Sequence, residues 1–267
     1  MAKKIFISAD IEGTCGIAHW QETNTNNEYS EYFRKQMTNE VKAACEGALE
    51  AGFDEIFVKD AHDSARNLYP NLLPKEAKIM RGWTRNPYSM MAGLDETFDA
   101  CAFTGYHSAA SASGNPLSHT MNCSIYYIKI NGVITSEFII NSLAAAYLGV
   151  PSVFLSGDKM LCEKAEEFAK GIKTVAVSEG IGNASVSIHP EIACERIKAT
   201  VTEALEGDYK KVLMKLPEKF EVEVAYKEHH KAFHATYYPG AYAIDSTTTG
   251  FKASNYLDVL KFFMFVL

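Results

Sequence analysis

The sequence lacks the motifs that would assign it directly to several common classes of protein. Its six cysteines are scattered, and no two have the Cys-x-x-Cys spacing of a thiolate zinc site or a redox motif. It contains no Gly-x-Gly-x-x-Gly and no Gly-Lys-Ser/Thr, which excludes the common phosphate-binding loops. The cysteine pattern predicts free, mostly buried thiols, as is usual in a reducing cytoplasm.

Positive charge and long apolar runs are also scarce. A formal net charge of -7 gives no electrostatic reason to expect nucleic acid or an anionic membrane as a partner. The apolar run at residues 5–7 is too short for a signal peptide, and the apolar residues 260–267 are too few to span a bilayer. We therefore expect a cytoplasmic protein with no membrane or nucleic-acid partner, and we expect residues 260–267 to end a core-facing helix.

Over the first two thirds of the 267 residues, apolar runs of strand length alternate with helical patterns. This alternation predicts an α/β fold with a mostly parallel sheet covered by helices. The Asn131-Gly132 pair favours a tight turn after a hairpin arm at residues 125–130. The predicted strands are 4–9, 55–62, 100–107, 152–158 and 174–177, and the predicted helices are 29–51 and 136–148.

The pattern changes after residue 185. A predicted helix begins with Pro190 and runs to about residue 205. Alternating polarity at residues 220–226 predicts a strand with one solvent-exposed face. A last helix, about residues 253–266, is expected to pack back on the body. We therefore predict an α/β metal-binding catalytic domain at residues 1–185 and a smaller α+β domain at residues 186–267.

Chemically active side chains follow three of the predicted strands. Asp10 and Glu12 follow the first strand, and extended backbone would point both carboxylates to the same side. Asp60 and His62 end the second strand, and His107 ends the third. Adjacent acids resist burial unless a cation or a shared proton compensates their charge. Because ligands bind beyond the carboxyl ends of strands in open parallel sheets, we expect these residues to converge.

Glu137, at a predicted helix start, can add a third carboxylate to a donor set without sulfur: Asp10, Glu12, His62, His107 and Glu137. Oxygen and nitrogen donors suit zinc, manganese, cobalt or iron. Five ligands exceed the usual three of one catalytic zinc, and with a bridging carboxylate they suit two metals about 3.5–4 Å apart. Its central position makes Asp10 the predicted bridge.

Each of these residues alone also has an ordinary explanation. The acids could cap helices or lie in loops, and the histidines could be turn residues or hydrogen-bonded core residues. Their joint placement at strand ends favours the metal site. For His119, in the turn-rich segment 114–120, the residues alone favour a surface histidine. Asp158, at the end of another strand, is a candidate supporting residue only.

Eight segments carry a resemblance over nearly the whole chain, in conserved order and with similar spacing. They are residues 8–13, 59–62, 93–98, 104–107, 117–119, 130–137, 157–158 and 239–249. Taken together, they resemble the binuclear-zinc D-aminopeptidase family of bacterial metallopeptidases. The resemblance implies two Zn²⁺ per subunit, with Mn²⁺ or Co²⁺ as possible substitutes.

The same resemblance implies roles for individual residues. Asp10 would bridge the metals, Glu12 and His62 would complete one site, and His107 and Glu137 would complete the other. His119 would be the catalytic histidine. The resemblance also implies a homo-oligomeric ring, possibly a decamer, that acts on short peptides.

We therefore predict a two-metal aminopeptidase that removes an N-terminal residue, possibly a D-amino acid, from short peptides or aminoacyl amides. One alternative is another dinuclear hydrolase, either a phosphoesterase or an amidohydrolase, because these enzymes use the same ligand types. The absence of clustered basic residues near the ligands, with Arg66 the nearest in sequence, counts against phosphate. The other alternative is a ring-forming protein that binds metal or peptide without catalysis.

Overall fold

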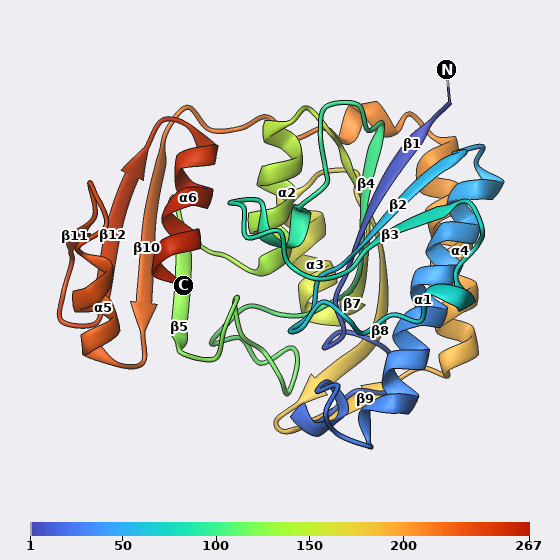
Figure 1. The fold of residues 1–267 in the computed structure, drawn as a ribbon, viewed down its shortest axis with the longest axis horizontal. Helices are drawn as coiled ribbons and strands as arrows, with labels where there is room; N and C mark the ends of the chain where they lie inside the picture. The colour runs from blue at the N-terminus through green and yellow to red at the C-terminus, as the bar shows by residue number, and fades with distance from the viewer. Residues whose placement is uncertain (1) are drawn as a thin grey trace.

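The computed structural model describes residues 2–267, and a seven-stranded sheet forms its centre (Figure 1). The strand order is β3-β2-β1-β4-β7-β8-β9. The strands from β3 to β8 run parallel, and β9 pairs antiparallel with β8 at the edge. The strands are β1 (Lys4–Ala9), β2 (Glu55–Asp60), β3 (Ala77–Met80), β4 (Ala100–Tyr106), β7 (Ser152–Asp158), β8 (Lys173–Ile181) and β9 (Ala184–Ser187).

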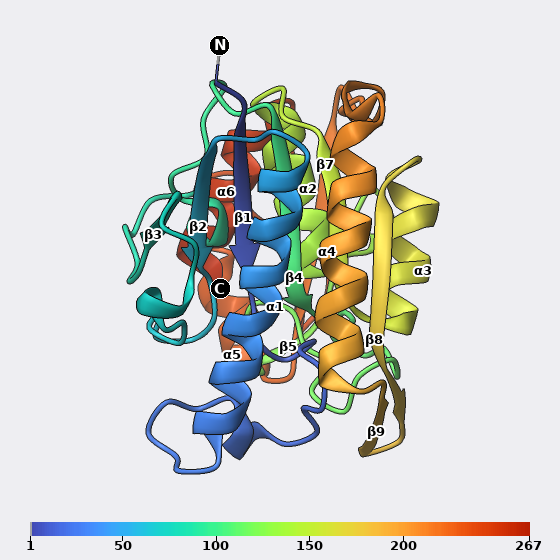
Figure 2. The same cartoon turned by 90° about the vertical axis from the view of Figure 1, so that its right-hand side faces the viewer.

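Helices cover both faces of this sheet because both faces of its strands are apolar. Successive side chains of a strand point to opposite faces, so Ile5 and Ile7 of β1 enter one hydrophobic core and Phe6 enters the other. α1 (Ser30–Glu50) and α4 (Pro190–Glu206) pack side by side over the first core (Figure 2). α2 (Glu137–Tyr147) and α3 (Lys159–Phe168) lie on the opposite face.

A second, antiparallel sheet stands beside α2, at the end of the molecule away from α1 and α4 (Figure 1). Its order is β11 (Tyr242–Ala243), β12 (Thr248–Ala253), β10 (Phe220–Tyr226), β5 (Ile125–Ile130) and β6 (Val133–Ile134). α5 (His229–Ala235) and α6 (Tyr256–Val266) pack on it, and Phe262 of α6 stacks on Phe251 of β12 at 4.6 Å between ring centroids. Short 3-10 helices occur at Trp20–Glu22, Pro70–Leu72, Ser89–Met91 and Tyr209–Val212.

The predicted fold class is confirmed, and most predicted elements occur within a few residues of their expected bounds. The Asn131-Gly132 turn joins β5 to β6, with φ of 51° and 80°. The sequence patterns do not predict α3, α5, β3, β9, β11 or β12. The domain division at residue 186 stays a prediction. The second sheet draws β5 and β6 from before that position, and α4 from after it packs on α1.

The backbones that leave β1 and β4 approach each other closely, and glycines permit this approach. Asp10 N donates to Thr104 O at 2.9 Å, and Gly13 N donates to Gly105 O at 2.8 Å. Gly105 has a φ of +69°, and a Cβ there would lie 2.1 Å from Asp10 O. A Cβ at Gly13 would lie 1.7 Å from the carbonyl oxygen of Tyr106. The loop that carries the first acids is therefore held tightly against the end of β4.

The thiol prediction is confirmed, because all six cysteines are free and four of them are buried. The end of α6 faces the core only in part. Phe262 and Phe263 are buried, whereas Phe265 is exposed. Among residues 2–267, the helices are all too short or too polar to cross a bilayer.

Glu40 is a buried carboxyl in α1 beneath the loop that follows β1. Its Oε1 accepts hydrogen bonds from Cys15 N and from Gln36 Nε2, both at 3.0 Å. Burial raises the pKa of Glu40 from 4.5 to about 7. Between these values the folded chain binds more protons than the unfolded chain, so stability decreases as pH increases.

Glu40→Gln should remove this pH dependence, because the amide keeps an oxygen for Cys15 N without becoming charged. Over pH 4.5–7, we expect the wild-type free energy of unfolding to fall by about 3 kcal/mol relative to the variant. Urea unfolding at a series of pH values measures the difference. An equal decrease in both proteins would show that Glu40 is not the group responsible.

Candidate metal centre

The predicted ligands converge at the carboxyl end of the central sheet. Asp10 and Glu12 follow β1, His62 follows β2, and His107 follows β4. β1 and β4 are neighbours at the point where the strand order reverses, which is where ligands of open parallel sheets bind. Glu137 reaches the same place from the first turn of α2, where Ser136 caps the helix by accepting a hydrogen bond from Ile139 N.

Asp10 lies between two groups of side chains. On one side, His62 Nδ1 is 3.3 Å from Asp10 Oδ1 and 3.0 Å from Glu12 Oε2. On the other, His107 Nε2 is 3.6 Å from Asp10 Oδ2 and also 3.6 Å from Glu137 Oε2. All five residues are buried. Each group of three can converge on one ion, and the two groups share Asp10.

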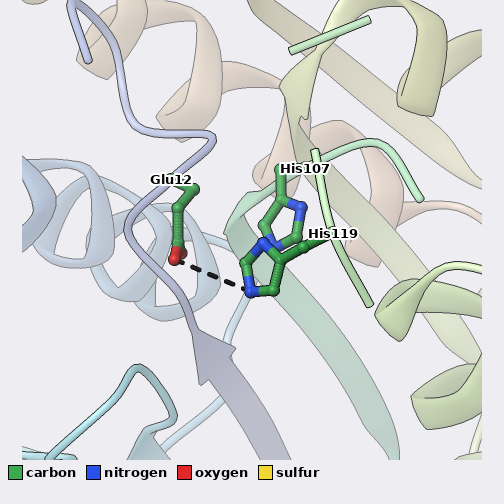
Figure 3. Close-up of side chains that lie close together, drawn as sticks. All are labelled: Glu12, His107 and His119. Atoms are coloured by element: carbon green, nitrogen blue, oxygen red, sulfur yellow. Dashed lines mark ion pairs between the residues drawn. The ribbon is translucent and has the colours of Figure 1, made fainter. Parts of the chain in front are cut away.

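His119 lies next to both groups. Its Nε2 lies 3.6 Å from Glu137 Oε1 and 3.9 Å from Glu12 Oε1. Its ring stacks on His107 with 4.3 Å between centroids and 10° between planes (Figure 3). The expectation of a surface histidine from the residues alone is wrong, because the segment after β4 folds back over the strand ends. Glu12, His107 and His119 also form a third group with ligand spacing.

Backbone carbonyls hold one nitrogen of each histidine ring. A neutral ring that donates to a carbonyl carries its proton on that nitrogen, so its other nitrogen presents a lone pair. In all three rings this second nitrogen faces the carboxylates, an arrangement typical of metal-binding histidines. The contacts are His62 Nε2 to Thr23 O (3.1 Å), His107 Nδ1 to Ser108 O (3.0 Å) and His119 Nδ1 to Leu117 O (2.9 Å).

The polar atoms of the cluster are better satisfied by a pair of divalent cations than by hydrogen bonds to one another. Within residues 2–267, buried Glu12 Oε2 and His107 Nε2 have no hydrogen-bond partner, and the His62 contact to Glu12 lacks hydrogen-bond geometry. Unpaired buried polar atoms are destabilising. With neutral rings, the three carboxylates carry a charge of about -3, which two divalent ions would offset. Oxygen and imidazole donors suit zinc, manganese or cobalt.

Electrostatics within the cluster favour bound positive charge. Burial and the neighbouring Glu12 raise the pKa of Asp10 well above its usual range. Burial acts against ionisation of Glu12 and Glu137. The neighbouring His62 nevertheless holds the pKa of Glu12 well below its usual value, and His107 lowers that of Glu137 to about 2. Despite burial, the carboxylates raise the pKa of both histidines. Protons and metal ions therefore compete for the same ring nitrogens.

His119 behaves differently from the other two histidines. Burial and the adjacent His107 ring lower its pKa, so the neutral ring is favoured. Its side chain is 13% exposed, whereas that of His107 is fully buried. The Trp20 ring packs edge-on against the His119 ring, with 5.2 Å between the ring centroids. A neutral histidine held at the edge of the cleft can accept or donate a proton.

Two strand-end acids support the cluster without joining it. Asp158 accepts hydrogen bonds from Ser108 N and Ser108 Oγ, both at 2.6 Å, and thereby fixes the carbonyl that holds the His107 ring. Asp60 accepts from Asn67 N at 2.6 Å and from Asn67 Nδ2 at 3.0 Å, which closes the loop after β2. The possibility that Asp60 is itself a ligand is therefore not supported by its geometry.

Other supporting residues had no signal in the sequence. Asn115 Nδ2 donates to Glu12 O at 3.0 Å, and Met121 N donates to Glu137 Oε1 at 2.7 Å. Both residues lie in the irregular segment between β4 and β5, whose path is not set by any periodicity. Only the folded chain shows that Asn115 holds the backbone of Glu12 and that Met121 holds the carboxylate of Glu137.

A cavity of about 890 Å³ opens beside the cluster, large enough for a small peptide. The cluster forms its base, and one wall is apolar and comes mainly from α2 and α6. That wall includes Ile140, Leu260, Phe263 and Met264. The loops after β2 and β3 also line the cavity, and they carry Arg66 and Arg85. The sequence indicated no basic residues clustered near the ligands, yet two arginines line the same cavity, because the loop after β3 returns to it.

Comparisons with known proteins agree with one another on the family. The chain matches the family described as D-aminopeptidase over residues 3–265. It is 29% identical over 260 residues to a D-aminopeptidase of Bacillus subtilis (strain 168), covering 97% of this chain and 94% of that protein. It also resembles the solved Zn-dependent D-aminopeptidase DppA from Bacillus subtilis, described as a self-compartmentalizing protease. The TM-score is 0.92 at 27% identity, covering 98% of this chain and 96% of the other. The chain belongs to the D-aminopeptidase family.

Proposed function

We propose that this protein is a metal-dependent aminopeptidase that removes the N-terminal residue, including a D-residue, from short peptides or aminoacyl amides. The main support is a pair of three-ligand groups that share Asp10 at the base of a peptide-sized cavity. Membership of the D-aminopeptidase family favours this activity over the other reactions that the same donors could serve. Free cysteines are consistent with a cytoplasmic location, which we also propose.

The metal proposed is zinc, with two ions per subunit. The solved relative is described as Zn-dependent, and the donor types of this chain suit zinc. One ion would be held by Glu12 and His62, and the other by His107 and Glu137. Asp10 would bind both ions. Bound zinc would supply an acidified water and a polarised scissile carbonyl. Mn²⁺ or Co²⁺ could occupy the same donors.

We assign the proton-transfer role to His119. Its Nε2 faces the cluster, its Nδ1 is held by Leu117 O, and its ring is favoured in the neutral form. From this position the ring can take a proton and pass it to the leaving amine, or donate a hydrogen bond to the developing oxyanion. Trp20 and His107 keep the ring in place from two directions.

We also propose that the protein assembles into a homo-oligomeric ring, with a decamer as one candidate size. The support is the likeness to a relative described as self-compartmentalizing, which extends over nearly all of both chains. A closed assembly would restrict access to the cavity to short, flexible peptides. Analytical ultracentrifugation measures the subunit number directly.

Metal removal tests the proposed activity. The purified protein should carry about two metal ions per chain and release D-alanine from D-alanyl amides. A chelator should abolish release and lower the melting temperature, because a metal that binds only the folded chain stabilises it. Added Zn²⁺ should restore both properties. Metal content is measured by mass spectrometry and melting by calorimetry.

Three results would contradict parts of this proposal. Turnover of p-nitrophenyl phosphate without peptidase activity would favour the phosphoesterase alternative. Metal binding and ring assembly without hydrolysis of any D- or L-aminoacyl amide would favour the non-catalytic alternative. Activity that a chelator leaves unchanged would exclude the metal mechanism.

A further inference from the structure

The residues that line the cavity carry charges of both signs. Its base holds the three carboxylates of the cluster, whereas the other charged lining residues are Asp63, Arg66 and Arg85. Neither arginine forms an ion pair within residues 2–267. Two exposed guanidinium groups without carboxylate partners therefore face a cavity whose base is built to bind cations.

The two loops that carry these arginines are tied to each other. Trp83 Nε1 donates to Asp63 O at 2.7 Å, and Gly82 N donates to Ala65 O at 2.8 Å. Arg81 Nη2 donates to Arg66 O at 3.4 Å. The loop after β2 and the loop after β3 thus form one surface. Arg66 and Arg85 belong to these two loops, and both line the cavity.

A buried lysine supports this surface from below. Lys59 is fully buried in β2, its Nζ donates to Gly82 O at 2.9 Å, and it lies 4.3 Å from the centroid of the Trp83 ring. Arg85 itself has a φ of 61°, a backbone conformation that non-glycine residues rarely adopt. Such conformations persist where the surroundings hold them, so the backbone that carries Arg85 is held in place.

Guanidinium groups bind carboxylates through two parallel hydrogen bonds. On the proposed function, a substrate places its amino end and scissile bond at the acid-rich base. The anionic group that a short peptide then offers to the cavity wall is its own C-terminal carboxylate. We propose that Arg66 and Arg85 form a subsite for this carboxylate, which makes free short peptides the preferred substrate class. The apolar residues of α2 and α6 that also line the cavity can contact a nonpolar side chain.

The test compares D-alanyl-glycine with D-alanyl-glycinamide, which differ only in the terminal charge. Wild-type kcat/KM should favour the free acid by about 10- to 100-fold, the range of charge-assisted hydrogen bonds. In the double variant Arg66→Gln with Arg85→Gln, this preference should disappear, mainly through KM. The kcat/KM of the double variant for the amide should stay within about twofold of the wild-type value.

Arg196→Gln is the matched control, because Arg196 is exposed on α4 and lies outside the cavity lining. It removes the same charge and should keep the preference for the free acid. Calorimetry adds a readout without turnover. The His119→Ala variant should bind D-alanyl-glycine at least tenfold more tightly than the amide, and the added arginine substitutions should abolish that difference.

The outcomes separate this inference from the proposed function. Equal hydrolysis of acid and amide by the wild type, or a preference that survives in the double variant, would overturn the subsite and leave the aminopeptidase intact. Failure to hydrolyse either compound would refute the aminopeptidase, and the binding comparison would then decide the subsite. Phosphatase turnover that requires both arginines would assign them to phosphate and overturn the inference.

Discussion

Replacing Asp10 by asparagine is expected to remove both metal ions and to lower kcat/KM by about a thousandfold or more, equivalent to about 4 kcal/mol of transition-state stabilisation. The physical reason is the shared position of Asp10. Its Oδ1 faces His62 and its Oδ2 faces His107, so both three-ligand groups lose a carboxylate in one substitution. An amide has the same shape but no negative charge to hold a second cation.

Glu12→Gln should have a smaller effect on metal content. Glu12 Oε2 contacts His62 in one group and is absent from the group of Asp10, His107 and Glu137. About one metal per chain should therefore remain in this variant, on the two-metal proposal. Metal titration followed by mass spectrometry distinguishes the two variants.

Asp63→Asn is the control for these substitutions, because Asp63 lines the same cavity but belongs to none of the three-ligand groups. It should keep the wild-type metal content. Equal metal loss in Asp10→Asn and Glu12→Gln would contradict the unequal roles of the two acids, and full metal content in Asp10→Asn would refute the bridge.

His119→Ala should reduce kcat by about 10²- to 10⁴-fold, the usual contribution of a positioned general acid or base. The metal content should stay at the wild-type value, because both groups that share Asp10 remain complete without His119. Steady-state kinetics on D-alanyl amides and metal analysis of the same sample measure the two quantities together.

The metal content of His119→Ala is the decisive part of this experiment. Glu12, His107 and His119 also have ligand spacing, so loss of an ion would identify His119 as a ligand instead of a proton carrier. His189→Ala is the matched control, because His189 caps α4 by accepting a hydrogen bond from Glu191 N and does not line the cavity. That control should retain full activity.

Much of the candidate centre could be predicted from local patterns. A strand is recognisable from a short apolar run, and the carboxyl ends of parallel strands meet at one edge, so Asp10, Glu12, His62 and His107 could be placed together. Glu137 was recognisable as the first-turn residue of a helix. These inferences need only the period of the sequence and the direction of the strands.

Residues in irregular segments could not be placed in this way. The segment that carries Asn115 and His119 has no periodicity, so its return over the end of β4 depends on contacts with distant parts of the chain. The same is true of Arg85, which reaches the cavity because Lys59 and Trp83 hold its loop. Turn residues predict that a chain bends, but they do not predict which surface it then covers.

The sequence by itself determined the fold class and indicated the strand ends and five candidate oxygen and nitrogen donors, because these follow from short-range periodicity and residue chemistry. Only the tertiary structure decided the spacing of those donors and the path of the chain that stacks the His119 ring on His107. It also decided that α6 and the loop after β3 enclose the cavity. Those arrangements depend on contacts between segments far apart in the chain, which packing establishes and local sequence does not encode.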